Sequence, residues 1–157
     1  MKTLILALGN PILSDDAVAY EVADRLARRC VGVDIIKSSS ATMDIIPKLA
    51  GYERLVVIDS VQLGSAPPGT VHRFSLDELA DSVRPSSPHD INFATAFQMA
   101  KKWGYDIPSD IRIYGIEVKE LLKFSEDFTP EVARKLDEIT EHISTELTKK
   151  LNDRNCQ

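Results

Sequence analysis

The sequence predicts an α/β domain with a mostly parallel central sheet. Short apolar runs alternate along the chain with longer amphipathic stretches, as strands alternate with crossover helices. The run at residues 55–58 is apolar throughout, which is typical of a parallel strand covered on both faces. The chain has 157 residues, 43% of them hydrophobic, which suits one domain with a sizeable core. We expect a single domain over residues 1–151 and a polar tail over residues 152–157.

The first part of the chain is expected to alternate strands and helices. Residues 4–8 form a buried strand that ends at Gly9-Asn10-Pro11, and Ser14 is expected to cap the next helix. Two carboxylates, Asp15 and Asp16, lie in its first turn, where they suit the helix dipole. Its apolar residues recur at helical spacing: Val18, Ala19, Val22, Ala23 and Leu26. The elements expected next are a strand at residues 31–36, a short helix at residues 42–50 and a strand at residues 55–58.

The second part is expected to contain one edge strand, one buried strand and two helices. Ser87 and Pro88 are typical of a helix start, and this helix is expected to end near Lys102. Thr129-Pro130-Glu131 opens the last helix. Its apolar stripe has the clearest period in the chain: Val132, Leu136, Ile139, Ile143, Leu147 and Leu151. The other elements expected here are a turn at residues 66–69 and strands at residues 70–74 and 111–116.

The charge balance and the cysteine count exclude several classes of protein. With 19 Lys and Arg against 24 Asp and Glu, the net charge of −5 lacks the basic excess of a nucleic-acid binder. Cys30 and Cys156 form no CxxC pair, which excludes a disulfide framework and a cysteine-based zinc site and fits a reducing compartment. The apolar N-terminus is too short for a signal peptide, and no apolar run is long enough for a membrane span. We therefore expect a soluble cytoplasmic protein that binds neither nucleic acid nor membrane.

Acidic and imidazole side chains follow the predicted strands. Ligands of open parallel sheets bind at the carboxyl ends of the strands, so these side chains are candidates for a functional site. Asp16 lies after the first strand, Asp59 ends the third, and His89 opens a later helix. Two carboxylates and one imidazole suit a borderline divalent metal with an open position, and they equally suit proton transfer. Each also has a structural interpretation, as a first-turn residue for Asp16 and His89 and as a loop contact for Asp59.

Other polar side chains are weaker candidates. Asn10 is expected either to position a backbone or substrate group or simply to form a turn. Glu117, at a strand end, is a weaker candidate to assist the site, and His72 and His142 are expected at the surface. The sequence has no HExxH, GxSxG, P-loop or GxGxxG motif, so it lacks the signatures of zincins, serine hydrolases and the common nucleotide-binding folds.

Four stretches of the sequence, each weak alone, are specific together. They are Gly9-Asn10-Pro11-Ile12-Leu13-Ser14-Asp15-Asp16-Ala17, Val57-Ile58-Asp59-Ser60-Val61 running into Pro68-Gly69-Thr70, Ser87-Pro88-His89-Asp90, and Tyr114-Gly115-Ile116-Glu117. In this order and at this spacing they resemble the NiFe-hydrogenase maturation endopeptidases. The resemblance spans residue 4 to about residue 135.

The resemblance implies a three-layer α/β/α sandwich with a twisted, mostly parallel sheet. It also implies an endopeptidase that removes a C-terminal extension from a NiFe-hydrogenase large-subunit precursor after nickel insertion. The family's metal-contacting and catalytic positions match Asp16, Asp59 and His89. Because the nickel belongs to the substrate, no permanent metal is expected, although cadmium or zinc is expected to substitute in vitro. Three such ligands with little sulfur hold a metal weakly and reversibly, which suits selection of a nickel-loaded precursor.

Two departures from the family's pattern bear on the substrate cleft. Ala17 stands where the family often has glycine, and residues 37–42 replace a loop that is often glycine-rich with an aspartate. Ser40 and Thr42 in this loop, together with Asn10, are expected to contact the substrate. The departures leave open which large subunit is recognised. They also motivate an alternative function, a maturation chaperone or nickel-sensing module that binds the large subunit without cutting it.

Peptidyl-tRNA hydrolases are a second alternative, because they also open with a strand followed by Gly-Asn-Pro. Their catalytic histidine lies in a stretch that corresponds here to Ala19-Tyr20-Glu21-Val22, which contains no histidine. Their basic surface for tRNA also conflicts with the net charge of −5. The sequence therefore favours the hydrogenase endopeptidase.

Overall fold

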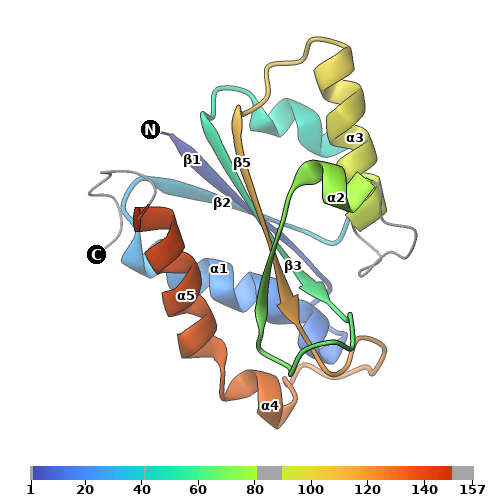
Figure 1. The fold of residues 1–157 in the computed structure, drawn as a ribbon, viewed down its shortest axis with the longest axis vertical. Helices are drawn as coiled ribbons and strands as arrows, with labels where there is room; N and C mark the ends of the chain where they lie inside the picture. Colours follow the sequence, from blue (N-terminus) through green and yellow to red (C-terminus); the bar gives the residue numbers. More distant parts are fainter. Residues whose placement is uncertain (1, 41, 81–89, 150–157) are drawn as a thin grey trace.

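A five-stranded sheet runs through the middle of the structure, which is a computed structural model that describes residues 2–40, 42–80 and 90–149. The strand order is β2-β1-β3-β5-β4, with β4 antiparallel to β5 and the other pairs parallel (Figure 1). The strands are β1 (Thr3–Leu8), β2 (Val33–Ser38), β3 (Arg54–Val61), β4 (Val71–Phe74) and β5 (Asp110–Glu117). The α-helices are α1 (Val18–Arg29), α2 (Leu76–Ala80), α3 (Asp90–Lys102), α4 (Pro130–Ala133) and α5 (Leu136–Lys149), and the 3-10 helices are η1 (Ser14–Ala17) and η2 (Met43–Leu49).

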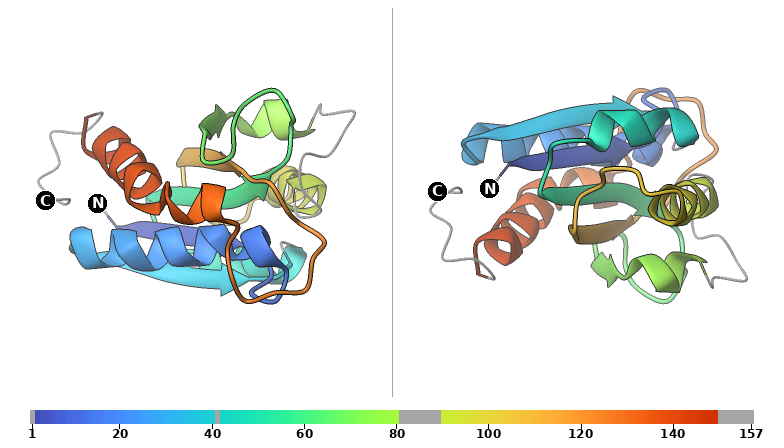
Figure 2. Two further views of the ribbon diagram at one scale, coloured as in Figure 1. Left: turned by 90° about the horizontal axis from the view of Figure 1, so that it is seen from below. Right: turned by 90° about the horizontal axis from the view of Figure 1, so that it is seen from above.

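Two apolar cores lie on opposite faces of the sheet. Along β1, Ile5 and Ala7 pack in the core beneath α1 and α5, whereas Leu4 and Leu6 pack in the core beneath η2 and α3. This alternation follows from the two-residue period of a strand. Figure 2 shows α1 and α5 in front of the sheet from one side and η2 and α3 from the other. The predicted three-layer α/β/α sandwich with a mostly parallel sheet is confirmed.

The apolar stripes predicted for two helices are the faces that they bury. The α1 stripe from Val18 to Leu26 is fully buried, and so is Ile143 in the middle of α5. Leu151, the last residue predicted in the α5 stripe, lies outside the described residues. The predicted final helix is divided, because α4 ends at Ala133 and α5 begins at Leu136.

Other predicted bounds shift by a few residues. β3 continues past residue 58 because its pairing with β5 extends to Val61, opposite Glu117. The short helix predicted at residues 42–50 is the 3-10 helix η2, which has Pro47 inside it. The helix α2 was not predicted, although Ser75 and Glu78 form the reciprocal hydrogen bonds of a capping box. The predicted start of the helix near Ser87 lies outside the described residues, and its predicted end matches the end of α3.

Cys30, at the C-terminal end of α1, is buried and disulfide-bonded. The cysteine count therefore gives no support for a reducing compartment, and a cytoplasmic location stays a prediction. None of the helices in the described ranges has both the length and the apolar composition that a membrane span requires.

Candidate active site

The four parallel strands all end at one edge of the sheet, which we call the carboxyl edge. β1 and β2 end side by side at Leu8 and Ser38, and β3 and β5 end beside them. Both predicted carboxylates lie at this edge. Asp16 is on η1, in the segment after β1, and Asp59 is near the end of β3.

Ser60 connects the two candidate acids. Its side-chain hydroxyl donates to Asp16 Oδ1 at 2.5 Å, and its backbone N–H donates to Asp59 Oδ1 at 2.8 Å. All three residues are buried, with at most 3% of their surface exposed. A hydrogen bond of this length from a hydroxyl to a carboxylate is charge-assisted, so it fixes the direction of the Asp16 carboxylate.

Strand alternation explains how β3 carries Asp59 and also contacts Asp16 through Ser60. In β3, Val57 packs in the core beneath η2 and α3, and Ile58 packs in the core beneath α1 and α5. Successive side chains point to opposite faces, so Asp59 follows Val57 to the α3 side and Ser60 follows Ile58 to the α1 side. η1 presents Asp16 on that α1 side. The sequence analysis missed the role of Ser60, although the two-residue period was sufficient to place it on the face opposite Asp59.

Gly9 allows η1 to lie against the end of β1. A Cβ on Gly9 would lie 2.1 Å from the backbone oxygen of Asp16, so no other residue permits this approach. Gly9 also donates its N–H to the Ser38 carbonyl at 3.1 Å and accepts the Tyr20 hydroxyl at 3.0 Å. Burial, and then the charge of Asp16, raise the pKa of Tyr20 above its ordinary value.

Asp15 fixes the loop that follows β5. Its fully buried carboxylate accepts the backbone N–H groups of Lys119, Glu120 and Thr129 and the Thr129 hydroxyl, at 2.8–3.1 Å. We call residues 119–128 the strap. The sequence assigned Asp15 only to a helix start, and no local pattern reveals these partners because they lie 104–114 residues away.

Ser14 also holds the strap instead of capping α1, which corrects the predicted helix start. Its backbone φ is 45°, and its hydroxyl donates to the Asp127 carbonyl at 3.1 Å. The hydroxyl is therefore directed away from the helix, and α1 begins only at Val18, after the 3-10 turn.

The predicted substrate-binding residues follow β1 and β2 at the carboxyl edge. Asn10 accepts the N–H of Ile12 on its side-chain oxygen at 3.2 Å, which is a turn-forming bond. Ser40 is exposed, and its carbonyl accepts the hydroxyl of Ser38 at 2.5 Å. Thr42 is exposed and donates its hydroxyl to the Asp44 carboxylate. Contact of Asn10, Ser40 and Thr42 with a substrate stays a prediction.

His89, the third candidate ligand, lies outside the described residues. The next residue, Asp90, begins α3, which packs on the same face of the sheet as Asp59. Within residues 2–40, 42–80 and 90–149, no group of three or more His, Cys, Asp or Glu side chains is placed to hold a metal ion. The carboxylate oxygens of Asp16 and Asp59 are of a type that suits a borderline divalent cation, and a role for Asp16, Asp59 and His89 as metal ligands stays a prediction.

Glu117, the weaker candidate to assist the site, holds the loop after β3. Its buried carboxylate accepts the N–H groups of Leu63 at 2.9 Å and Gly64 at 3.1 Å. His72 Nε2 lies 3.9 Å from Glu117 Oε1, and its side chain is only 20% exposed, so His72 is not the surface residue that we expected. His142 is exposed on α5, as expected.

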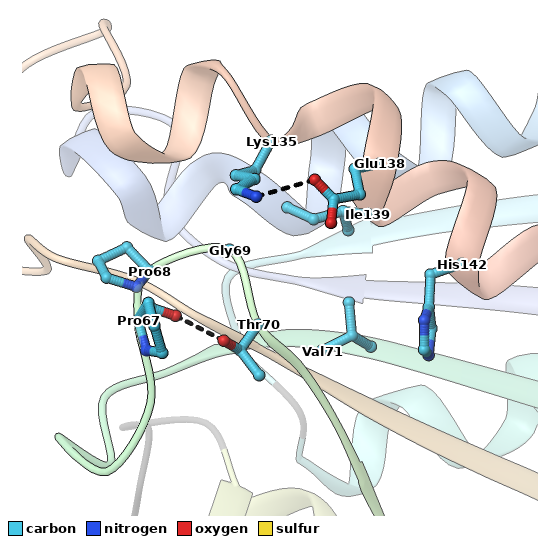
Figure 3. Close-up of a pocket in the computed structure, with 9 residues that line it drawn as sticks. All are labelled: Pro67, Pro68, Gly69, Thr70, Val71, Lys135, Glu138, Ile139 and His142. Atoms are coloured by element: carbon cyan, nitrogen blue, oxygen red, sulfur yellow. Dashed lines mark hydrogen bonds and ion pairs between the residues drawn. The ribbon is translucent and has the colours of Figure 1, made fainter.

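A hollow of about 310 Å³ lies between α5 and the turn before β4 (Figure 3). Pro67, Pro68 and Gly69 line one side of it, and Lys135 and Glu138, joined by a 2.9 Å ion pair, line the other. Asp16 and Asp59 do not line this hollow, so it is separate from the candidate site.

Comparison with known proteins connects this geometry to a family. The sequence model of the hydrogenase maturation proteases matches residues 18–146. The chain is similar to the hydrogenase 2 maturation protease of Escherichia coli K12, with 24% identity over 147 residues that cover 91% of this chain and 88% of that protein.

The fold is similar to those of two solved structures. One is the hydrogenase maturating endopeptidase HybD from E. coli, with a TM-score of 0.80, 22% identity and coverage of 96% of this chain and 94% of that chain. The other is the [NiFe] hydrogenase maturation protease HybD from Thermococcus kodakarensis, with a TM-score of 0.73, 25% identity and coverage of 95% and 100%. Because the family's sequence model matches most of its length, the chain belongs to the hydrogenase maturation protease family.

Proposed function

We propose that this peptidase removes the C-terminal extension of a NiFe-hydrogenase large-subunit precursor after nickel insertion, and that Asp16, Asp59 and His89 recognise the substrate's nickel. The observation that supports the proposal is Ser60, which hydrogen-bonds to both buried carboxylates at the carboxyl edge. Membership of the hydrogenase maturation proteases supports a hydrogenase precursor as the substrate.

The proposed ligands suit a metal that arrives with the substrate. Carboxylate oxygens and an imidazole nitrogen bind borderline divalent cations, and the set has no thiolate to retain such an ion permanently. A nickel-loaded precursor therefore gains binding energy that a nickel-free precursor lacks. The chain purified alone is expected to hold no stoichiometric metal, and cadmium or zinc is expected to occupy the same ligands in vitro. Elemental analysis before and after addition of these ions measures both expectations.

Peptide hydrolysis requires a water oxygen to attack the scissile carbonyl carbon and a proton to reach the leaving amine. Asp16 or Asp59 can take the proton of that water, and the substrate's nickel can polarise the carbonyl. Ser60 is a positioning residue in this scheme, because it holds both carboxylates through its hydroxyl and its backbone N–H.

Intact-mass spectrometry of a large-subunit precursor encoded in the same genome tests the proposal. The wild-type protein is expected to remove a C-terminal peptide from the nickel-loaded precursor and not from the nickel-free one. Asp16→Asn, Asp59→Asn and His89→Ala are each expected to slow this loss by about 100-fold or more. Asp137→Asn is the control, since this α5 side chain is 85% exposed. Wild-type rates in the three site variants would refute the assignment.

The same experiment separates the alternative of a non-cutting chaperone or nickel-sensing module. A binder of that kind shifts the precursor on a native gel and leaves its mass unchanged. A complex without mass loss, for the nickel-loaded precursor, would replace the endopeptidase proposal with this alternative.

A further inference from the structure

Three large apolar side chains are exposed next to the candidate site. Leu122 and Phe124, both on the strap, are 82% and 78% exposed, and Ile12, in the segment between β1 and η1, is 49% exposed. Isolated exposed apolar residues are ordinary on protein surfaces, whereas a cluster of large ones marks an interaction site.

Backbone pairing places Ile12 opposite Phe124, and Leu122 lies two residues before Phe124 on the strap. Leu13 and Ser125 form a parallel bridge, in which Ser125 donates its N–H to the Ile12 carbonyl at 3.0 Å and Ser14 donates to the Ser125 carbonyl at 2.8 Å. Ile12 and Phe124 directly precede the bridged residues on two parallel segments, whose backbones lie about 5 Å apart in such pairing. We call Ile12, Leu122 and Phe124 the ridge.

Hydrogen bonds within the protein restrain the strap. Asp15 binds the first two residues of the strap and Thr129, which directly follows it, and the Glu120 carboxylate accepts the N–H groups of Leu122 at 2.9 Å and Lys123 at 3.0 Å. These amides are thus bonded within the protein, while the side chains of Leu122 and Phe124 extend into solvent. A preorganised surface loses little conformational entropy on binding, which favours a docking role.

A hollow of about 240 Å³ lies beside the ridge. It borders both the strap and η1, and its lining is part polar and part apolar: Ser14, Lys123, Ser125, Asp127, Phe128, Thr129 and Pro130. An apolar ridge next to a hollow with polar and apolar lining is the arrangement expected where a protein surface docks and one of its side chains or a chain segment enters the hollow.

We propose that the ridge is the docking surface for the large-subunit precursor, in addition to the contacts that its nickel and scissile peptide make with Asp16 and Asp59. This inference rests on the proposed function. The occupant follows from continuity, because Ile12 is in the same segment as Asp16 and Asp15 ties the strap to that segment. A protein that brings a peptide to Asp16 approaches the segment that also carries Ile12, so its surface can contact the ridge.

The test uses the double variant Leu122→Ser/Phe124→Ser and the nickel-loaded precursor. Substitution of exposed side chains leaves stability nearly unchanged, so thermal unfolding of the variant should match that of the wild type. We expect the Kd for the precursor and the KM for processing to rise by about tenfold or more, with kcat unchanged, because only docking is lost. Val31→Ser is the matched control, since Val31 is also 82% exposed but precedes β2, away from the carboxyl edge.

Each outcome supports or overturns the inference. Wild-type Kd and KM in the double variant, with processing intact, would overturn it and leave the proposed function standing. Loss of binding in the double variant, with no processing even by the wild type, would support docking and refute the endopeptidase function. A wild-type dimer that the double variant converts to monomer on size exclusion would assign the ridge to a second copy and overturn the inference. A wild type that neither binds nor processes the precursor would overturn both.

Discussion

Gly9 is the residue at which the candidate site has no space for a side chain. In Gly9→Ala the new Cβ must displace the Asp16 carbonyl, which lies 2.1 Å from its position, so the acid moves with η1. We expect a loss of about 2 kcal/mol in the free energy of unfolding and a large loss of precursor processing. Urea denaturation and the mass assay measure the two effects.

Gly32→Ala is the control for this prediction. Gly32 has a φ of 76° and nothing within 4 Å of a new Cβ, so its variant adds only backbone strain of about 1 kcal/mol. Equal loss of processing in both variants would mean that the contact between Gly9 and Asp16 has no special role.

The sequence was sufficient to locate both carboxylates of the candidate site but not the residues that hold them. Asp16 and Asp59 were predictable because the carboxyl ends of parallel strands share one edge. The hydrogen bonds of Ser60 required the register of β3 against η1, which the sequence does not contain. The role of Asp15 was beyond prediction, because its carboxylate also suits a helix start and its partners are distant in the chain.

The strap is an element without regular secondary structure whose position depends on one carboxylate. In Asp15→Ala, three backbone N–H groups and the Thr129 hydroxyl lose a buried acceptor, so we expect about 3–4 kcal/mol of destabilisation. Hydrogen exchange at the Glu120 and Thr129 amides should accelerate. Asp15→Asn keeps one acceptor oxygen and should have a smaller effect. Unchanged exchange at both amides in Asp15→Ala would show that other contacts hold the strap.

β3 and β5 are joined at the opposite edge of the sheet by a charged cluster. Asp110 accepts Arg54 Nε at 2.7 Å and Arg112 Nε and Nη2 at 3.2 Å, and both arginine side chains are 5% exposed. Burial raises the pKa of Asp110, but the hydrogen bonds from Arg54 and Arg112 outweigh burial and hold this pKa below its ordinary value. The cluster therefore stabilises the pairing of β3 with β5 only while Asp110 is ionised.

Asp110→Asn should lower the free energy of unfolding at pH 7 by about 2–3 kcal/mol. This is less than for a fully buried pair, because 32% of the Asp110 side chain is exposed. The carboxylate stabilises the fold above its unfolded-state pKa and loses that contribution as pH falls through the lower folded-state pKa. Unfolding curves of wild type and variant should therefore converge in acid. A constant separation from neutral pH into acid would contradict the role of ionised Asp110.

Element types were more predictable than element bounds. The apolar run at residues 55–58 identified β3, but only the pairing with β5 shows that β3 extends to Val61. The break between α4 and α5 leaves the apolar stripe continuous, so periodicity alone did not reveal it. The five-residue α2 is too short for a periodic pattern, and its only local indication was the capping box of Ser75 and Glu78.

At the scale of the whole molecule, two separate cores share one sheet. Leu26→Ala removes a fully buried side chain from the core beneath α1 and α5, which should cost about 3 kcal/mol and lower Tm by about 6–12 °C.

Trp103 follows α3 on the other face of the sheet. If both cores unfold as one domain, Trp103 fluorescence and far-UV circular dichroism should shift by the same amount. Separate transitions would refute the single domain predicted for residues 1–151.

The overall architecture was predictable because the alternation of strands and helices permits few arrangements of a parallel sheet. One of these permitted arrangements places β1 between β2 and β3, as in this sheet. The antiparallel β4 at the edge agreed with its alternating sequence and short length. The sequence did not indicate how far the C-terminal part of the chain reaches back to the first turn.

The long-range contact of Asp15 with the strap and Thr129 has a consequence for biosynthesis. Asp16, Asp59 and Ser60 are all synthesised within the first 60 residues, whereas the strap and Thr129, which bind Asp15, are synthesised much later. A nascent chain thus contains both acids well before it contains the groups that hold their turn in place. Translation that stops before residue 119 would yield a fragment with both acids and no fixed turn, so we expect such fragments to be inactive. Proteolytic competence is therefore acquired only near the end of synthesis.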